Sequence, residues 1–196
     1  MKRFVFLICL MLLSTTCAYA EQYLSSMDLE NLKAAMEVTR AGVKAGESPF
    51  GAVVAGPDGS ILMTQYNVSV STHDQTKHAE SMLASRFCQA YYKHPEFRSK
   101  CTLYSSMEPC AMCMYTMFSA GIGRVVYGLS ADRLYELFDQ YGSWPRTLLS
   151  SHQAASYMSS PMIVVGPHLE DEAAAIVDNA LKMYEAKRLI KKKGTQ

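Results

Sequence analysis

The stretch "SSMEPCAMCMYT", residues 105–116, sets two cysteines, Cys110 and Cys113, three positions apart. Such a pair can bind a metal ion, act as a redox disulfide or do neither. The residues before it have the pattern of a buried strand and those after it the pattern of a helix. Side chains at positions i and i+3 of a helix start can turn toward one point, and the helix dipole favours their thiolate forms. The stretch therefore predicts a strand-to-helix junction that presents two thiolates together.

An earlier segment, "HAE" at 78–80, opens another predicted helix. His78, Cys110 and Cys113 together offer three nitrogen and sulfur ligands of the kind that zinc prefers, and a fourth position stays open for water. Glu80 is near enough to His78 to reach that water without binding the metal, and its carboxyl group can carry a proton to a departing amine. We therefore expect a catalytic zinc site. The alternatives are a redox pair for the cysteines, an ordinary surface or capping role for His78, and for Glu80 the role of a first-turn acid that the helix dipole favours.

The rest of the chain predicts strands that alternate with helices. An amphipathic helix is expected at 26–45, with Ser26 as its N-cap, and a β-hairpin at 49–67. Further strands are expected at 101–106, 124–130 and 161–167, further helices at 78–92, 110–121 and 170–190, and a short helix or a loop at 132–142. This order predicts a three-layer α/β/α sandwich around a central mixed five-stranded sheet, mostly parallel with the hairpin as an antiparallel edge. The connection at 142–160 is long enough for a lid or an insertion.

The first twenty residues have the pattern of a secretory signal peptide. Lys2 and Arg3 precede the apolar run at 4–13, and small residues at 18 and 20 allow cleavage before Glu21. The run is too short to span a bilayer as a helix. A lipid anchor at Cys17 and a buried N-terminal helix are the alternatives. We expect residues 1–20 to be a signal peptide, residues 21–196 a single domain, and the protein to be exported, periplasmic or secreted, with no membrane attachment after cleavage.

The charge balance argues against nucleic acid as a partner. The chain carries 19 Lys and Arg and 18 Asp and Glu. Loss of Lys2 and Arg3 with a signal peptide leaves 17 basic and 18 acidic residues, a net charge of −1. Such a chain has no general attraction for phosphate backbones. The basic cluster at 187–193 is typical of the solvated end of a helix.

"HAE" together with "EPCAMC", residues 108–113, behind the "PFGAVV" hairpin segment, residues 49–54, resembles the cytidine-deaminase-like superfamily. The resemblance covers most of residues 27–130 and is closest to the branch that holds guanine deaminases, yeast-type cytosine deaminases and tRNA adenosine deaminases. It implies a zinc-dependent deaminase domain over residues 21–196, with Zn²⁺ bound by His78, Cys110 and Cys113 and with Glu80 as the proton shuttle. The positions that it implies for substrate binding are Phe50, Gly51, Ala52, Asn67, Ala79 and Asp139.

Several residues depart from the family pattern. Gln75 stands where relatives have proline, and Met114 and Tyr115 follow the second cysteine where relatives have small residues. Asp139 lies in "LFDQ", where bacterial guanine deaminases have "GFDD". We expect Met114 and Tyr115 to reshape the pocket. On the "PFGAVV" and "LFDQ" likeness we favour a purine, guanine first, as the free nucleobase or nucleoside that is deaminated with release of ammonia.

The family resemblance also implies a homodimer, and two alternative functions stay open. One is a secreted, toxin-like deaminase that acts on nucleic acid, and the other is a non-catalytic zinc or redox module. Cys88 and Cys101 lie outside the motif and are a possible disulfide, since an exported protein meets an oxidising environment. Two free buried thiols are the alternative for this pair.

Overall fold

The computed structural model describes residues 24–142, 146, 148–160 and 162–193. The expected signal peptide therefore lies outside the described residues. Among the described helices, none combines the length and the apolar character that a membrane span requires.

The elements follow the expected order, with three short helices added. The helices are α2 (Ser26–Ala45), α3 (Ser69–Thr72), α4 (Ala79–Ala90), α5 (Pro95–Arg98), α6 (Ala111–Ala120), α7 (Ala131–Asp139), α8 (Ser151–Ser156) and α9 (Glu170–Lys193). The strands are β1 (Gly51–Ala55), β2 (Ile61–Tyr66), β3 (Thr102–Met107), β4 (Arg124–Leu129) and β5 (Ile163–Val165). The three added helices are α3 and α5, in segments for which no helix was expected, and α8, within the connection expected at 142–160. The N-cap of α2 is Ser25, whose hydroxyl accepts from the backbone N–H of Asp28, and not Ser26 as expected.

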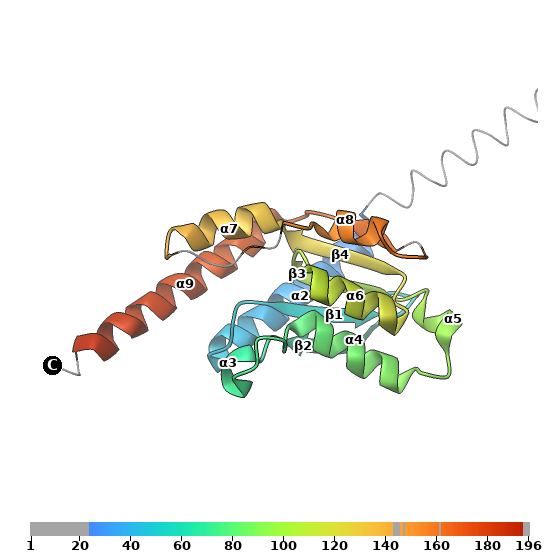
Figure 1. Ribbon diagram of the computed structural model, residues 1–196, viewed down its shortest axis with the longest axis horizontal. Coiled ribbons are helices and arrows are strands. Elements are labelled where there is room, and N and C mark those ends of the chain that lie inside the picture. The colour runs from blue at the N-terminus through green and yellow to red at the C-terminus, as the bar shows by residue number, and fades with distance from the viewer. Residues whose placement is uncertain (1–23, 143–145, 147, 161, 194–196) are drawn as a thin grey trace, which may run out of the picture.

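The five strands form one mixed sheet in the order β2-β1-β3-β4-β5. β1 is antiparallel to both β2 and β3, whereas β3, β4 and β5 are parallel. The mixed five-stranded sheet is confirmed, but the hairpin is not merely an antiparallel edge. Because β2 and β3 both run against β1, they are parallel to each other, and α4 connects them across β1 (Figure 1).

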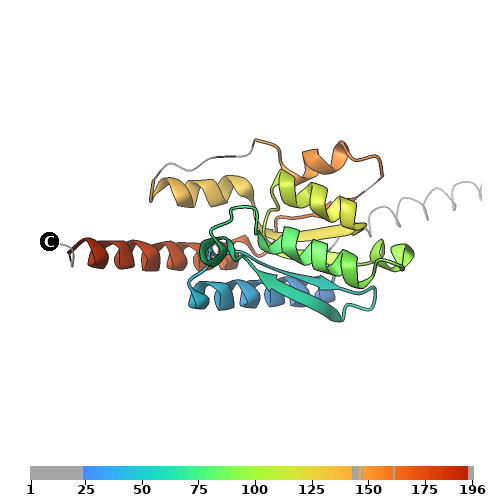
Figure 2. The same cartoon turned by 60° about the horizontal axis from the view of Figure 1, so that its bottom comes forward.

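Helices cover both faces of the sheet and create two apolar cores. One core joins α2, α7 and α9 to the sheet through residues such as Leu32, Leu134 and Val177. The other joins α4, α6 and α8 through residues such as Phe87 and Met117. Figure 2 shows the hairpin of β1 and β2 between α2 and α4. This three-layer arrangement brings the starts of α4 and α6 together.

Candidate active site

The three candidate metal ligands lie at the starts of two neighbouring helices. His78 is the N-cap of α4 and Cys110 the N-cap of α6, and Cys113 lies in the first turn of α6. His78 Nδ1 is 3.7 Å from Cys110 Sγ and 3.6 Å from Cys113 Sγ, and the two sulfurs are 3.7 Å apart. Tetrahedral zinc with Zn–S bonds of about 2.3 Å and a Zn–N bond of about 2.0–2.1 Å needs sulfurs about 3.8 Å apart and nitrogen about 3.6 Å from each sulfur. The three atoms therefore fit the corners of a zinc tetrahedron.

The two thiols differ in acidity. The pKa of Cys110 is lowered to about 4, chiefly by the hydrogen bond with Cys113 and also by His78. The pKa of Cys113 is raised by the same hydrogen bond and by burial, and the pKa of His78 is raised chiefly by Cys110. The lowered pKa of Cys110 favours its thiolate, the form that binds zinc. A zinc ion binds thiolates and neutral imidazole, so its binding releases the protons that remain.

Glu80 is a buried carboxyl group directly beside the ligand cluster. Its side chain is 5% exposed, and burial raises its pKa. Oε1 accepts a hydrogen bond from the Ser105 hydroxyl at 3.1 Å, and Oε2 lies 3.6 Å from Cys113 Sγ. A carboxyl group with a raised pKa is suited to take up and return a proton near neutral pH.

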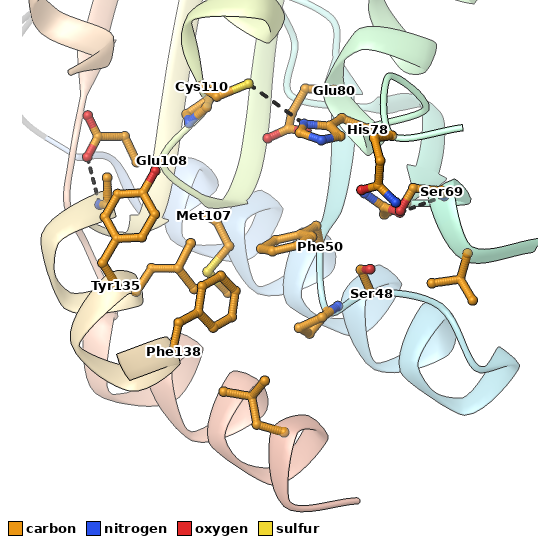
Figure 3. Close-up of a pocket in the computed structure, with 18 of the residues that line it drawn as sticks. Ser48, Phe50, Ser69, His78, Glu80, Met107, Glu108, Cys110, Tyr135 and Phe138 are labelled. Carbon is orange, nitrogen blue, oxygen red and sulfur yellow. Dashed lines mark hydrogen bonds between the residues drawn. The ribbon is translucent and has the colours of Figure 1, made fainter. Parts of the chain in front are cut away.

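A cavity of about 500 Å³ opens onto this cluster, and Figure 3 shows His78, Glu80 and Cys110 at one end of it. Phe50 and Met107 lie in its middle. Asn67 also lines the cavity, and its Oδ1 accepts hydrogen bonds from the backbone N–H and the hydroxyl of Ser69. These two bonds fix the amide orientation, so its nitrogen is the group that can donate to a ligand.

The structure brings only part of the expected substrate site together. Phe50 and Asn67 line the cavity, whereas Gly51, Ala52, Ala79 and Asp139 are not among the described lining residues. Gly51 instead packs tightly on α2, where a Cβ atom would come 2.5 Å from the backbone nitrogen of Thr39. Asp139 is half exposed and forms an ion pair with Arg146. It therefore gives no support to guanine recognition.

The residues that depart from the family pattern do not lie where we expected them relative to the cavity. Gln75 lines the cavity. Met114 is fully buried in the core and Tyr115 is 43% exposed, and neither lines the cavity. The expectation that these two residues reshape the pocket was wrong, because the turn of α6 directs them away from it.

The possible disulfide between Cys88 and Cys101 is not formed. Both are free thiols. Arg98 Nη1 donates to Cys88 Sγ at 3.2 Å, and Cys101 Sγ donates to the Phe97 carbonyl at 3.3 Å. The alternative of two free thiols therefore holds, although only Cys101 is buried and Cys88 is half-buried.

Sequence reasoning missed two residues of this site, Ser105 and Glu108. Ser105 holds Glu80, and the alternation of side chains along β3 could have directed it toward α4. Glu108 lines the cavity and accepts hydrogen bonds from the backbone N–H groups of Ala131 and Ser151. No local pattern predicts those partners, because they are distant along the chain.

A mixed sheet flanked by helices, with one nitrogen and two sulfur ligands beside a buried carboxylate, defines the class of zinc-dependent deaminases. The family model of the cytidine and deoxycytidylate deaminase zinc-binding region matches residues 25–129, and the chain belongs to this family. It is therefore a hydrolase of nucleobases or nucleosides with zinc as its cofactor.

Individual relatives agree with this assignment. A probable cytosine deaminase of Schizosaccharomyces pombe is 37% identical over 150 residues, which is 76% of this chain and 90% of the relative. The guanine deaminase of Bacillus subtilis is 35% identical over 97 residues, 49% of this chain and 60% of the relative. A solved structure of guanine deaminase from Nitrosomonas europaea has a TM-score of 0.62 at 21% identity and covers 82% of this chain and 86% of its own. The last comparison shows the fold alone.

Proposed function

We propose that this chain deaminates a free nucleobase, with a purine preferred and guanine first, and that Glu80 is its proton shuttle. The observation that carries the proposal is the position of Glu80, a buried carboxyl group whose Oε2 lies 3.6 Å from the sulfur of a candidate zinc ligand at the end of a cavity. The reaction consumes one water molecule, replaces a ring amino group by oxygen and releases ammonia.

Each residue of the site has a distinct role in this reaction. His78, Cys110 and Cys113 would hold the zinc ion. Zinc, when bound, acts as a Lewis acid that makes a water molecule nucleophilic at neutral pH. Glu80 accepts the proton of that water and returns it to the amino group that leaves. Asn67 donates from its amide nitrogen to the ring, and Phe50 excludes water from the ring face.

The size of the cavity supports the preference for a purine. A bicyclic base fills more of a cavity of about 500 Å³ than a pyrimidine does, and apolar walls favour the larger ring. Cytosine is the second candidate, because the S. pombe relative, similar over 76% of this chain, is a probable cytosine deaminase.

The test is ammonia release from guanine, adenine, cytosine and their nucleosides by zinc-loaded protein. Glu80→Gln should keep zinc at unit stoichiometry and lose about 10²- to 10⁴-fold in kcat. Glu96→Gln, an exposed carboxylate on α5, is the matched control and should behave as wild type. A chelator should abolish turnover. Full activity of Glu80→Gln would overturn the assignment of the proton shuttle.

We further propose that the enzyme is exported. The support is the order of Lys2 and Arg3, the apolar run at 4–13 and the small residues before Glu21. Fractionation of the source cell, with N-terminal sequencing of the protein, tests the proposal. A mature chain that begins at Glu21 outside the cytoplasm is the expected result, and an uncleaved cytoplasmic chain would contradict it.

A homodimer is also proposed, on the family resemblance alone. Light scattering of the zinc-loaded protein should give twice the mass of one chain, and the mass of a single chain would contradict it.

A further inference from the structure

The cavity has two chemically different ends. The end described above carries His78, Glu80 and Cys110, and the opposite end is apolar. Phe138 of α7 lies at that end, and Leu134 of α7 and Leu181 of α9 line the same cavity and belong to the apolar cluster against which Phe138 packs. Figure 3 shows Phe138 across Met107 and Phe50 from the reacting groups. A base whose amino group faces Glu80 therefore directs its remote edge toward apolar side chains.

The charges around the cavity disfavour a phosphate at the apolar end. Among the described residues that line the cavity, none is a lysine or an arginine, and Glu80 and Glu108 are acidic. Arg146 lies over the ring of Tyr135, with its guanidinium carbon 5.4 Å from the ring centroid, but its charge is paired with Asp139. A phosphate entering this space would lose its hydration and meet like charge without an available cation.

Two hydrogen-bonding groups that line the cavity, the Glu108 carboxylate and the Tyr184 hydroxyl, already have protein partners. Oε1 of Glu108 accepts from the backbone N–H and the hydroxyl of Ser151, and Oε2 accepts from the backbone N–H of Ala131. The hydroxyl of Tyr184 donates to the backbone carbonyl of Glu47. A ribose placed there would bring hydroxyl groups to apolar walls, which costs free energy unless they find partners.

We propose that the substrate carries an uncharged, apolar substituent on the ring nitrogen remote from its amino group, and that this substituent occupies the space between α7 and α9. The inference rests on the proposed deamination of a nucleobase ring and changes the preferred substrate from the free base to a base that is substituted on a ring nitrogen. A cavity of about 500 Å³ is in the size range that binds drug-sized molecules, so a bare base leaves the apolar end unfilled. An alkyl or aryl group there removes apolar surface from water on both sides of the contact.

The experiment uses wild-type, zinc-loaded full chain and the base that releases ammonia fastest. That base is compared with its N-methyl, N-butyl and N-benzyl forms, its nucleoside and its nucleoside monophosphate. We expect kcat/KM to rise about fourfold for each methylene that is buried, to be lower for the nucleoside than for the N-butyl form, and to be lowest for the monophosphate. A kcat/KM for the N-butyl form no higher than for the N-methyl form would overturn the inference while leaving deamination intact. No ammonia from any base would overturn the proposed function, and this inference with it.

Two leucines on α9 provide matched variants. Leu181 lines the cavity and is 7% exposed, whereas Leu189 lies further along the helix and is 49% exposed. Leu181→Thr should lower the ratio of kcat/KM for the N-butyl form to that for the N-methyl form about fourfold, and Leu189→Thr should leave the ratio unchanged. Because the measure is a ratio of two substrates on one protein, partial unfolding of Leu181→Thr does not affect it. An unchanged ratio in Leu181→Thr would contradict the proposed position of the substituent.

Discussion

Two adjacent serines of β3 show how neighbouring residues acquire different roles. Ser105 points to α4 and donates to Glu80 Oε1 at 3.1 Å. Ser106 points to α2, where its Oγ accepts from the Thr39 hydroxyl at 2.7 Å and from the backbone N–H of Gly51 at 3.2 Å. Successive side chains of a strand face opposite sides of a sheet, so one serine contacts the site and the other the α2 packing layer.

Ser105→Ala should therefore lower kcat while leaving KM and zinc content close to wild type. A hydrogen bond to a charged group contributes about 1.5–3 kcal/mol, so the loss in kcat should be about tenfold or more. Steady-state kinetics and metal analysis check this result. Ser105→Thr keeps a hydroxyl and should recover part of kcat. Ser106→Ala is the matched control and should lower stability with little change in kcat. A loss of kcat in Ser106→Ala without one in Ser105→Ala would refute the positioning role of Ser105.

Gly51 provides a second test at the residue scale. A Cβ atom there would lie 2.5 Å from Thr39 N and 2.9 Å from the Ala35 carbonyl oxygen, both backbone atoms of α2. Gly51→Ala should destabilise the fold by about 1–3 kcal/mol in urea unfolding, because α2 must move away from β1. Gly56→Ala meets only the Asp58 side chain at that range and should cost much less. A raised KM at unchanged stability would instead support the expected approach of this segment to the base.

At the scale of elements, Glu108 connects the site to two helices. Its carboxylate accepts from the backbone N–H of Ala131, the first residue of α7, at 2.9 Å and from that of Ser151, the first residue of α8, at 2.8 Å. A negative charge at two helix starts satisfies N–H groups that have no partner within the helix. Because Glu108 precedes Cys110 by two residues, the ligand loop and these helices share one anchor.

Glu108→Gln should loosen α7 and α8 together. An amide cannot accept on both sides as a carboxylate does, so at least one helix start loses its partner, at a cost of about 1–3 kcal/mol. Hydrogen–deuterium exchange should accelerate in both helices. Glu170→Ala is the control, since Oε1 of Glu170 accepts from both the N–H and the hydroxyl of Ser130, the N-cap of α7, and alanine removes both bonds. It should loosen α7 but not α8, and equal effects of the two variants on α8 would contradict the shared anchor.

At the scale of the whole molecule, the sequence predicts those features that depend on local pattern. His78 and the two cysteines lie at helix starts, and side chains at a helix start can turn toward one point. The structure brings the three side chains together as expected. Asp139 was expected near the base, but it forms an ion pair with Arg146 and is not among the described residues that line the cavity. The interior place of β1, second in the sheet, likewise depends on a long-range contact, the pairing of β1 with β3. Contacts between distant segments leave no periodic signal in the sequence.

The pairing of the first helix with the sheet gives the last prediction. Asp28 of α2 accepts from both terminal nitrogens of Arg124 in β4 and from the Tyr104 hydroxyl in β3. Burial raises the pKa of Asp28, but the bonds from Arg124, Ser25 and Tyr104 outweigh burial and hold the pKa well below its usual range.

Since the folded-state pKa of Asp28 lies below the unfolded value of about 3.9, its carboxylate stabilises the fold above about pH 4, and this contribution is lost as the pH falls through the folded-state pKa. Asp28→Asn should lower the free energy of unfolding at pH 7 by about 1.5–3 kcal/mol. Urea unfolding of wild type and variant between pH 7 and pH 3 should show the difference narrowing below pH 4. Asp58→Asn, on the exposed hairpin turn, should show no comparable loss at pH 7. A difference for Asp28→Asn that stays constant down to pH 3 would mean that shape, and not charge, holds α2 against the sheet.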